Sequence, residues 1–385
     1  MCIVTPLILI NADTIHRETI MARTLRGDLF SPDETAIVHV MNRTTRRCLL
    51  FGNDTLSGKN YDHRKVWFEN RLRLLASTFG IDLLCYTIMS NHFHLILRSR
   101  PDVVRTWDDT EVARRWLTLC PVQKDEDGNA IPPADEALNT IRNDELMVAQ
   151  IRRRLSDISW WMRLLCQPIA QRANLEDEAT GKFFEARFKA TRLLDETSVL
   201  ACAAYVDLNP IRAALAETLE GSPFTSIHKR LEDLKAVERL EDNQTLAVSP
   251  ETDETTATFR DASCFLAPVD LQERSSQTGA CVHQDGHRCS DKGFLPMTAA
   301  AYAELLDWTA RQVRGDKRGA TPADLPPLFE RLQIDERKWV KLVGEFGKLF
   351  YLMAGTPERI ASQRSPDGNR RFRTSPAVRD LLATA

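Results

Sequence analysis

Two histidines separated by one residue, His92 and His94, lie in the otherwise apolar run IMSNHFHLIL at residues 88–97. On a β-strand, successive side chains point to opposite faces, so the two imidazoles share one face and Phe93 lies on the other. Two imidazoles placed in this way can bind one cation without bending the backbone. A motif this short also arises by chance, so the pair predicts a metal site only together with a partner elsewhere.

The partner is the helical stretch AAYVDLNPIRAAL at 203–215, which carries Tyr205 and Asn209. Residues four positions apart share one face of a helix. Asparagine directly before Pro210 is unusual inside a helix, because the residue preceding proline is pushed out of the helical region. Taken alone, the stretch is better explained by a core tyrosine and an asparagine that caps the C-terminal end of the helix.

Three blocks together resemble the single-tyrosine HUH transposases, in particular their REP-associated branch. The blocks are MSNHFHLIL, FFEARFKATRLL and YVDLNPIRA, and their order and spacing match over about 35–235. The resemblance implies that His92 and His94 are metal ligands, that Tyr205 is the nucleophile, and that Asn209 is the third ligand. Other branches of the family have glutamine at the position of Asn209.

The activity that the resemblance implies is DNA transposition. A free tyrosine, with a pKa near ~10, is a poor nucleophile at neutral pH, so a divalent cation, Mg²⁺ or Mn²⁺, is expected to polarise the phosphodiester. Attack by Tyr205 gives a 5′-phosphotyrosine and a free 3′-hydroxyl. The expected partner is single-stranded DNA bearing a hairpin, and action as a homodimer stays open. A replication initiator or relaxase is disfavoured by YVDLNPIRA. The alternative from another class is a non-catalytic, transposase-derived DNA-binding protein or regulator.

Basic residues beside two of these motifs are predicted to contact DNA. Cationic side chains neutralise phosphates, and aromatic side chains interleaved with them can stack on bases. A solvated basic surface beside a core strand is the competing explanation. The predicted DNA-binding residues are Arg43, Arg46, Arg47, Lys182, Arg187, Lys189 and Arg192.

The strands and helices predicted around these residues indicate an α+β fold, in which helices flank an antiparallel sheet. Alternation over 35–43 indicates a strand, helical spacing over 62–80 indicates a helix, and two strand-like runs follow, joined by Ser90 and Asn91. The resemblance adds that this sheet is a ferredoxin-like HUH domain.

Further helices are expected after these strands. Residues 146–174 form a long amphipathic helix or two shorter ones. Residues 195–219 are helical up to a break at Pro210, with Asp195 as the N-cap and the proline opening a second helix.

The chain divides by composition into segments with different expected roles. A leader precedes the catalytic domain, with translation expected to begin at Met21, and a Pro- and acid-rich insertion interrupts the domain. The segment CVHQDGHRC contains two cysteines and two histidines, which are typical zinc ligands. Its Cys–His pairs are closer together than in a zinc finger, so the segment is assigned to the linker. The expected divisions are a leader at 1–34, a catalytic domain at 35–235 with an insertion at about 100–145, a linker at 236–293, and a C-terminal helical unit at 294–385.

The bulk composition is that of a soluble globular protein, with 43% hydrophobic and 27% charged residues. No apolar run approaches the ~18 to 20 residues of a membrane helix, and MCIVTPLILINA lacks the basic segment of a secretory signal. Nine scattered cysteines, an odd number, indicate reduced thiols. We therefore expect a cytoplasmic protein without a membrane partner, and the net charge of −3 does not point to any partner.

Overall fold

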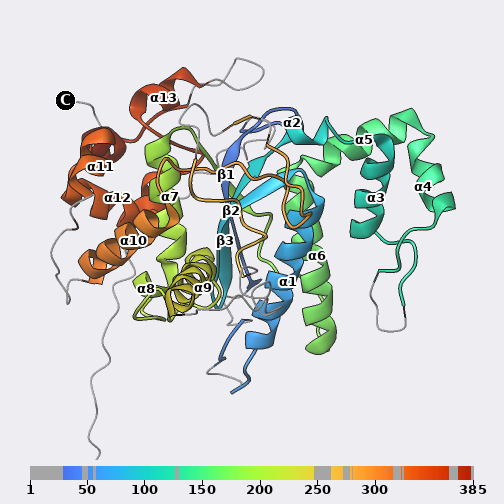
Figure 1. Cartoon of the computed structure of the whole chain (residues 1–385), viewed down its shortest axis with the longest axis horizontal. Coiled ribbons are helices and arrows are strands. Elements are labelled where there is room, and N and C mark those ends of the chain that lie inside the picture. The colour runs from blue at the N-terminus through green and yellow to red at the C-terminus, as the bar shows by residue number, and fades with distance from the viewer. Residues whose placement is uncertain are drawn as a thin grey trace, which may run out of the picture.

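The computed structural model describes most of the chain, and the element bounds below refer to that part. The expected start at Met21 and the basic residues Arg46 and Arg47 lie outside the described residues. In the described part, helices surround one five-stranded sheet (Figure 1). The described residues are 29–45, 51–54, 58–125, 130–246, 262–271, 278–279, 281–314, 322, 325–363 and 372–382.

The sheet has the strand order β2-β3-β1-β4-β5. β1 pairs antiparallel with β3 and β4, β3 pairs antiparallel with β2, and β5 runs parallel to β4. β1 and β2 are therefore parallel to each other with β3 between them, and helix α1 provides the crossover that parallel strands need. The predicted α+β class and the strands and helix predicted over 35–97 are confirmed. The bounds are β1 Ile37–Arg43, α1 Asp62–Thr78, β2 Ile81–Ile88, β3 His92–Ser99, β4 Lys189–Leu193 and β5 Met353–Ala354.

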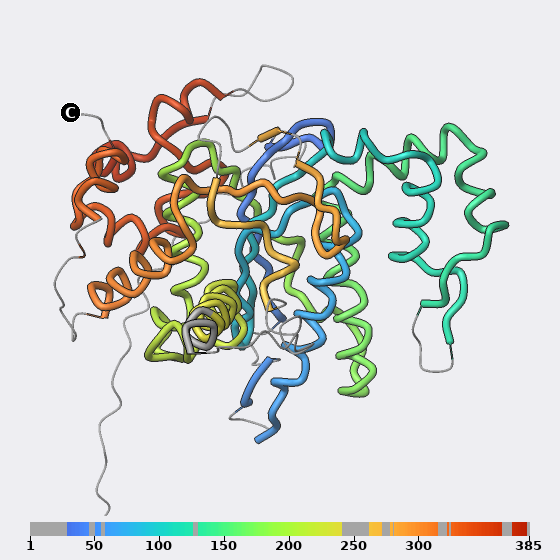
Figure 2. Tube along the Cα trace, viewed as in Figure 1, coloured from blue at the N-terminus to red at the C-terminus, as the bar shows by residue number. Residues whose placement is uncertain are grey.

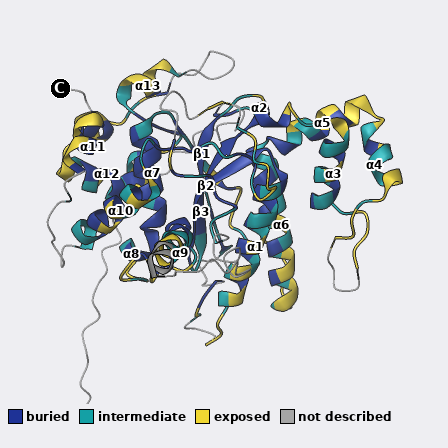
Figure 3. Cartoon of the chain, viewed as in Figure 1, coloured by how far each residue is buried: buried dark blue, intermediate teal, exposed yellow. Residues whose placement is uncertain are grey.

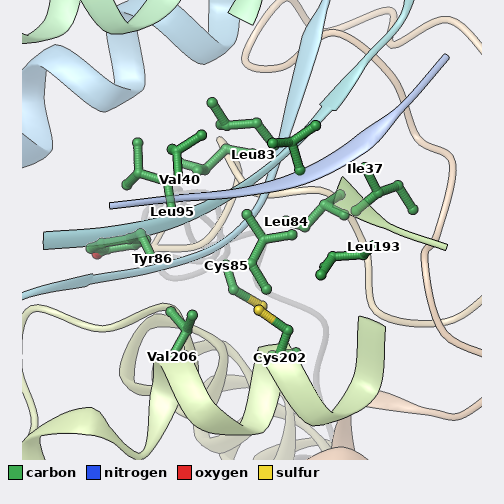
Figure 4. Close-up of a cluster of buried hydrophobic side chains, with 14 of the residues drawn as sticks. Ile37, Val40, Leu83, Leu84, Cys85, Tyr86, Leu95, Leu193, Cys202 and Val206 are labelled. Carbon is green, nitrogen blue, oxygen red and sulfur yellow. The ribbon is translucent and has the colours of Figure 1, made fainter. Parts of the chain in front are cut away.

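The alternation along the strands divides the core between the two faces of the sheet. Phe93 and its neighbours on one face are buried against α1, where Phe68 lies 4.5 Å from Phe93 between ring centroids. The other face is covered by α7 (Glu196–Asp207), and Cys85 of β2 and Cys202 of α7 point toward one another there (Figure 4). This second face carries the two histidines, so α7 lies directly over the candidate site.

Residues 100–176 form helices beside the sheet. The predicted insertion folds into three helices, of which α3 and α4 pack with α5 as a lobe at the right of Figure 2. The stretch predicted as one or two helices is two, because Asp157 caps the second by accepting a hydrogen bond from the Ser159 amide at 2.6 Å. The bounds are α2 Pro101–Val104, α3 Asp109–Leu119, α4 Asp135–Arg142, α5 Glu145–Leu155 and α6 Ile158–Glu176.

The helix that carries Tyr205 begins and ends as predicted. Asp195 caps α7 by accepting a hydrogen bond from the Ser198 amide at 2.9 Å, and the Ser198 hydroxyl accepts one from the Asp195 amide. The helix stops at Asp207, and Asn209 and Pro210 open the short helix α8 (Asn209–Arg212). The proline at the start of α8 is tolerated because the first amides of a helix have no intrahelical acceptor.

The expected linker at 236–293 needs a correction where it is described. Helix α9 (Ser226–Leu246) runs through its first part, and residues 262–271 then pack along the edge of the sheet, with Leu266 bridged to Leu83 of β2. Beyond them, the buried Arg98 guanidinium donates to the Gly293 carbonyl at 2.9 Å. The polar composition of 236–293 did not predict these contacts, because only a few buried residues and backbone pairings hold the segment in place.

The C-terminal residues are helical as predicted, but they share one core with the sheet and α7. β5 extends the sheet, α12 packs on α7, and the Tyr302 hydroxyl donates to the buried Asp207 carboxylate at 2.8 Å. Figure 3 shows buried residues continuing from the sheet into α7 and the C-terminal helices. The elements are α10 Ala299–Arg314, α11 Leu325–Arg331, α12 Glu336–Leu349, α13 Pro357–Ser362 and α14 Pro376–Leu382.

None of the helices in the described part of the chain is both long and apolar enough to cross a membrane.

Candidate active site

The fold brings the two predicted histidines and the predicted nucleophile together. His92 and His94 lie at the start of β3, with ring centroids 5.0 Å apart and planes at 84°. The Tyr205 ring approaches from α7 and stands edge-on to His94, with 5.5 Å between centroids and an angle of 89°. Residues far apart in the sequence therefore meet because α7 crosses the histidine face of the sheet.

A third histidine, His39 of β1, belongs to the same cluster, and sequence reasoning assigned no site role to it. Its ring lies nearly parallel to that of His94, 5.1 Å between centroids and 9° between planes, and its Nε2 lies 2.9 Å from His94 Nδ1. The pairing of β1 with β3 sets Met41 opposite His94, so His39 reaches His94 diagonally on the same face. Its place on the histidine face follows only once that register is known.

Both histidines of the pair have their Nδ1 atoms occupied by neighbouring side chains. His92 Nδ1 lies 2.6 Å from the Asn91 amide oxygen, which can only accept, so His92 Nδ1 donates. When His94 Nδ1 donates to His39, the lone pair of His94 lies on Nε2 as well. Partners of this kind fix the tautomer and the orientation of metal-binding histidines in proteins. With these tautomers, the Nε2 atoms of His92 and His94 carry the lone pairs and have no hydrogen-bond partner among the described residues.

Burial keeps these imidazoles neutral. Desolvation lowers the pKa of His39 to about 4 and, with help from the positive charge of Arg43, lowers the pKa of His92 to about 4. The pKa of His94 falls well below its ordinary value, mainly through burial and then through its histidine neighbours. Neutral imidazole is the form that binds a metal ion, so the site holds its histidines ready for one at neutral pH.

The ring of Tyr205 is half-buried and contacts residues from two further helices. The Arg212 guanidinium of α8 lies over it, 4.5 Å from the centroid, and Phe346 of α12 packs against it at 5.6 Å. Arg212 also donates to the Gly344 carbonyl at 2.6 Å, which ties α8 to α12. Within the described residues, the Tyr205 hydroxyl makes no hydrogen bond, so the phenol is held by its ring.

Asn209 lies one helical turn beyond Tyr205 and is buried. Its side chain forms no hydrogen bond with either histidine among the residues described. In the same part of the chain, no group of three or more His, Cys, Asp or Glu side chains is arranged to hold a metal ion. A metal bound by the histidine pair would therefore need a donor of another type, and the assignment of Asn209 as that donor stays a prediction.

The predicted DNA-binding residues differ in their surroundings. Arg43 ends β1 opposite His92, is half-buried, and its Nε atom is buried without a hydrogen-bond partner in the described part. Lys182, Arg187 and Lys189 are exposed. These four side chains are therefore available to a phosphate backbone.

Arg192, in contrast, is already paired. Its Nη1 and Nη2 atoms each lie 3.0 Å from a carboxylate oxygen of Glu34, and Nη1 also donates to the Leu29 carbonyl at 2.9 Å. A guanidinium bound on both nitrogens by a carboxylate has little charge left for DNA. The expectation for Arg192 is thus weakened by a pairing with a residue far away in the sequence.

The aromatic residues that alternate with these basic residues face the core. Phe183 and Phe188 are buried, and Phe183 lies 5.9 Å from Phe51 between ring centroids. Phe184 packs edge-on against Phe93 at 6.0 Å. Phe183 and Phe188 are therefore occupied by the protein, and only the half-buried Phe184 keeps an exposed part that a base could contact.

The Cys- and His-containing segment at 281–289 makes protein contacts of an ordinary kind. His283 Nδ1 lies 2.8 Å from the Asp291 carboxylate, and Cys289 is buried. The rings of His283 and His287 are 6.2 Å apart. Burial raises the pKa of the Cys289 thiol well above its ordinary value.

Comparisons with known proteins give one distant likeness. No protein-family model matches the chain, and no curated protein matches its sequence. A solved structure of a REP-associated tyrosine transposase bound to a REP hairpin is similar with a TM-score of 0.32 and 10% sequence identity. The match covers 55% of this chain and 86% of that chain. At this TM-score the likeness carries no argument, so any functional conclusion depends on the residues described above.

Proposed function

We propose that this protein is a DNA transposase that cleaves and rejoins single-stranded DNA with Tyr205 as the nucleophile. The carrying observation is the edge-on contact of Tyr205 with His94, 5.5 Å between ring centroids, beside a second histidine on the same strand. A tyrosine that served only the core would not need neutral imidazoles with ordered Nδ1 partners next to it. The strand order, with β3 between the parallel strands β1 and β2, supports the ferredoxin-like topology expected for an HUH domain.

The donor set at this site fits a divalent cation, Mg²⁺ or Mn²⁺. His92 and His94 would offer neutral Nε2 atoms, and the amide oxygen of Asn209 would be the third donor. Imidazole ligands favour Mn²⁺, while a phosphate substrate suits either ion. The bound ion would supply Lewis-acid polarisation of the phosphate.

The remaining chemistry belongs to residues of this chain. The Tyr205 oxygen attacks the phosphorus, the bond from phosphorus to the 3′-oxygen breaks, and the products are a 5′-phosphotyrosine and a 3′-hydroxyl. The new ester conserves the energy of the broken one, so a second 3′-hydroxyl can reverse the step at another site without ATP. Arg43 at the end of β1 and the exposed Arg187 and Lys189 would bind the backbone on either side.

Covalent trapping tests this proposal. The protein is incubated with Mn²⁺ or Mg²⁺ and a labelled, hairpin-bearing single strand, and a denaturation-resistant adduct is sought on a gel. We expect the adduct with the wild-type protein and its loss in Tyr205→Phe and His92→Ala. Tyr351→Phe is the matched control, because the Tyr351 side chain is 76% exposed on the segment before β5.

The outcomes separate two classes of protein. An adduct that survives in Tyr205→Phe would refute the role of this tyrosine. Tight binding of hairpin DNA without any adduct, in either metal, would favour the alternative of a non-catalytic, transposase-derived DNA-binding protein.

A further inference from the structure

The C-terminal helix α12 lies against the candidate nucleophile through a short segment, Gly344 to Gly347. Phe346 packs on one side of the Tyr205 ring, 5.6 Å between centroids, and the ring of His39 stands edge-on to Phe346 at 6.3 Å. The Arg212 guanidinium also lies on the Tyr205 ring, and its Nη2 donates a hydrogen bond to the Gly344 carbonyl. The segment thus contacts the tyrosine, the arginine over it and the histidine behind it.

Gly347 lies next to the phenol oxygen itself. A Cβ atom placed on Gly347 would be 2.9 Å from the Tyr205 hydroxyl oxygen and 3.4 Å from the carbon that bears it. Ordinary contacts of a Cβ begin at 3.4 Å, so the hydroxyl would have to move by about half an ångström. The missing side chain of Gly347 is therefore what gives the hydroxyl its present position.

A glycine inside a helix is costly, which makes its presence at this contact informative. Glycine destabilises a helix interior by roughly 0.5–1 kcal/mol relative to alanine. Gly347 lies inside α12, which runs from Glu336 to Leu349, and its exposed backbone would accept an alanine if Tyr205 were absent. The contact with the hydroxyl is particular to Gly347, since a Cβ on Gly344 of the same helix would meet nothing within 4 Å.

We propose that Gly347 of α12 is a positioning residue of the active site, because the space left by its missing side chain sets the direction of the Tyr205 hydroxyl. The inference rests on the proposed transposase function and adds a C-terminal residue to its machinery. In-line attack demands a defined direction of the attacking oxygen, and a misplacement of about 1 Å can cost a hundredfold in rate. The ring contacts of Phe346 and Arg212 fix the phenol plane, and Gly347 fixes where its oxygen ends.

Gly347→Ala tests the inference, and the same helix offers a matched control. A Cβ on Gly344 would meet nothing within 4 Å, so Gly344→Ala makes the same chemical change while leaving Tyr205 untouched. Both substitutions replace glycine by a better helix former, so both variants should fold. We expect Gly347→Ala to form the covalent adduct about tenfold to one hundredfold more slowly in a single turnover, with unchanged DNA affinity, and Gly344→Ala to match the wild type.

A second readout is independent of activity. The protein contains five tyrosines, so 3-fluorotyrosine labelling gives a short fluorine spectrum in which Tyr205 is assigned from its absence in Tyr205→Phe. We expect the Tyr205 signal to shift in Gly347→Ala and to stay in place in Gly344→Ala.

The two readouts distinguish the possible failures. An adduct rate in Gly347→Ala equal to or faster than the wild-type rate overturns the positioning role, as does an equal slowing in Gly344→Ala. A fluorine signal that stays in place in Gly347→Ala shows that the contact itself is absent. If the wild-type protein forms no adduct at all, the transposase function fails, and the shift alone then decides whether Gly347 orients the phenol.

Discussion

Replacing His39 with leucine probes the layer of side chains behind the candidate metal ligands. In the wild-type protein His39 Nε2 lies 2.9 Å from His94 Nδ1, and both rings are buried. Without this acceptor, the proton of His94 is free to move to Nε2, the atom that a metal ion would need. Metal binding would force the proton back onto a buried Nδ1 that has lost its partner.

The cost of that step sets the expected magnitude. A buried donor left without an acceptor costs about 1–3 kcal/mol, and about 1.4 kcal/mol corresponds to a factor of ten in a binding constant. We therefore expect His39→Leu to weaken Mn²⁺ binding by about tenfold to one hundredfold, in line with the usual effect of removing a partner behind a metal ligand.

Isothermal titration of the purified protein with Mn²⁺ measures this effect. His39→Gln is the matched control, because its amide oxygen restores an acceptor for His94 Nδ1, and it should recover part of the affinity. Urea unfolding without metal establishes that each variant is folded at the temperature of the titration. Wild-type affinity in His39→Leu would refute the reasoning, and so would an equal loss in the glutamine variant.

Two further predictions concern DNA binding and the joining of the C-terminal helices to the core. Lys189→Gln should lower the slope of log affinity against log salt for single-stranded DNA by about 0.7, measured by fluorescence anisotropy, whereas Arg192→Gln should change it less because Arg192 is bound to Glu34. An equal change in both variants would contradict the pairing. Tyr302→Phe should destabilise the whole chain by about 1–3 kcal/mol in one urea transition, because it removes the hydroxyl bound to buried Asp207. The exposed Tyr351→Phe should be neutral, and a separate early transition in Tyr302→Phe would show that the C-terminal helices unfold independently.

The local parts of the site could be predicted from sequence because they depend on short-range rules. Alternation placed His92 and His94 on one face of a strand, and the cap at Asp195 and the proline at Pro210 marked where the helices begin. His39 carried the same alternation, but its contact with His94 depends on the register between β1 and β3, which no short window of residues contains.

Contacts across long distances in the sequence account for the other differences. Arg192 lies in a basic, aromatic stretch of the kind that contacts DNA. Its ion pair with Glu34, a residue of the segment before β1, depends on the tertiary fold. The segment expected as a linker is anchored by a backbone bridge between Leu266 and Leu83. The polar composition of the segment does not predict this pairing. The composition of a segment describes that segment alone. Both differences arise from contacts between two segments that are distant in the sequence.

The position of α12 has a consequence for the order in which the protein becomes complete during synthesis. Translation delivers Tyr205 and both histidines of the pair to the nascent chain before it reaches Phe346 and Gly347. A ribosome-bound chain that has emerged only as far as α11 already carries every proposed catalytic side chain, yet nothing rests on the phenol ring from α12. Full competence for strand cleavage would then arise only after α12 has been synthesised and has packed on α7, later than the synthesis of the proposed catalytic side chains.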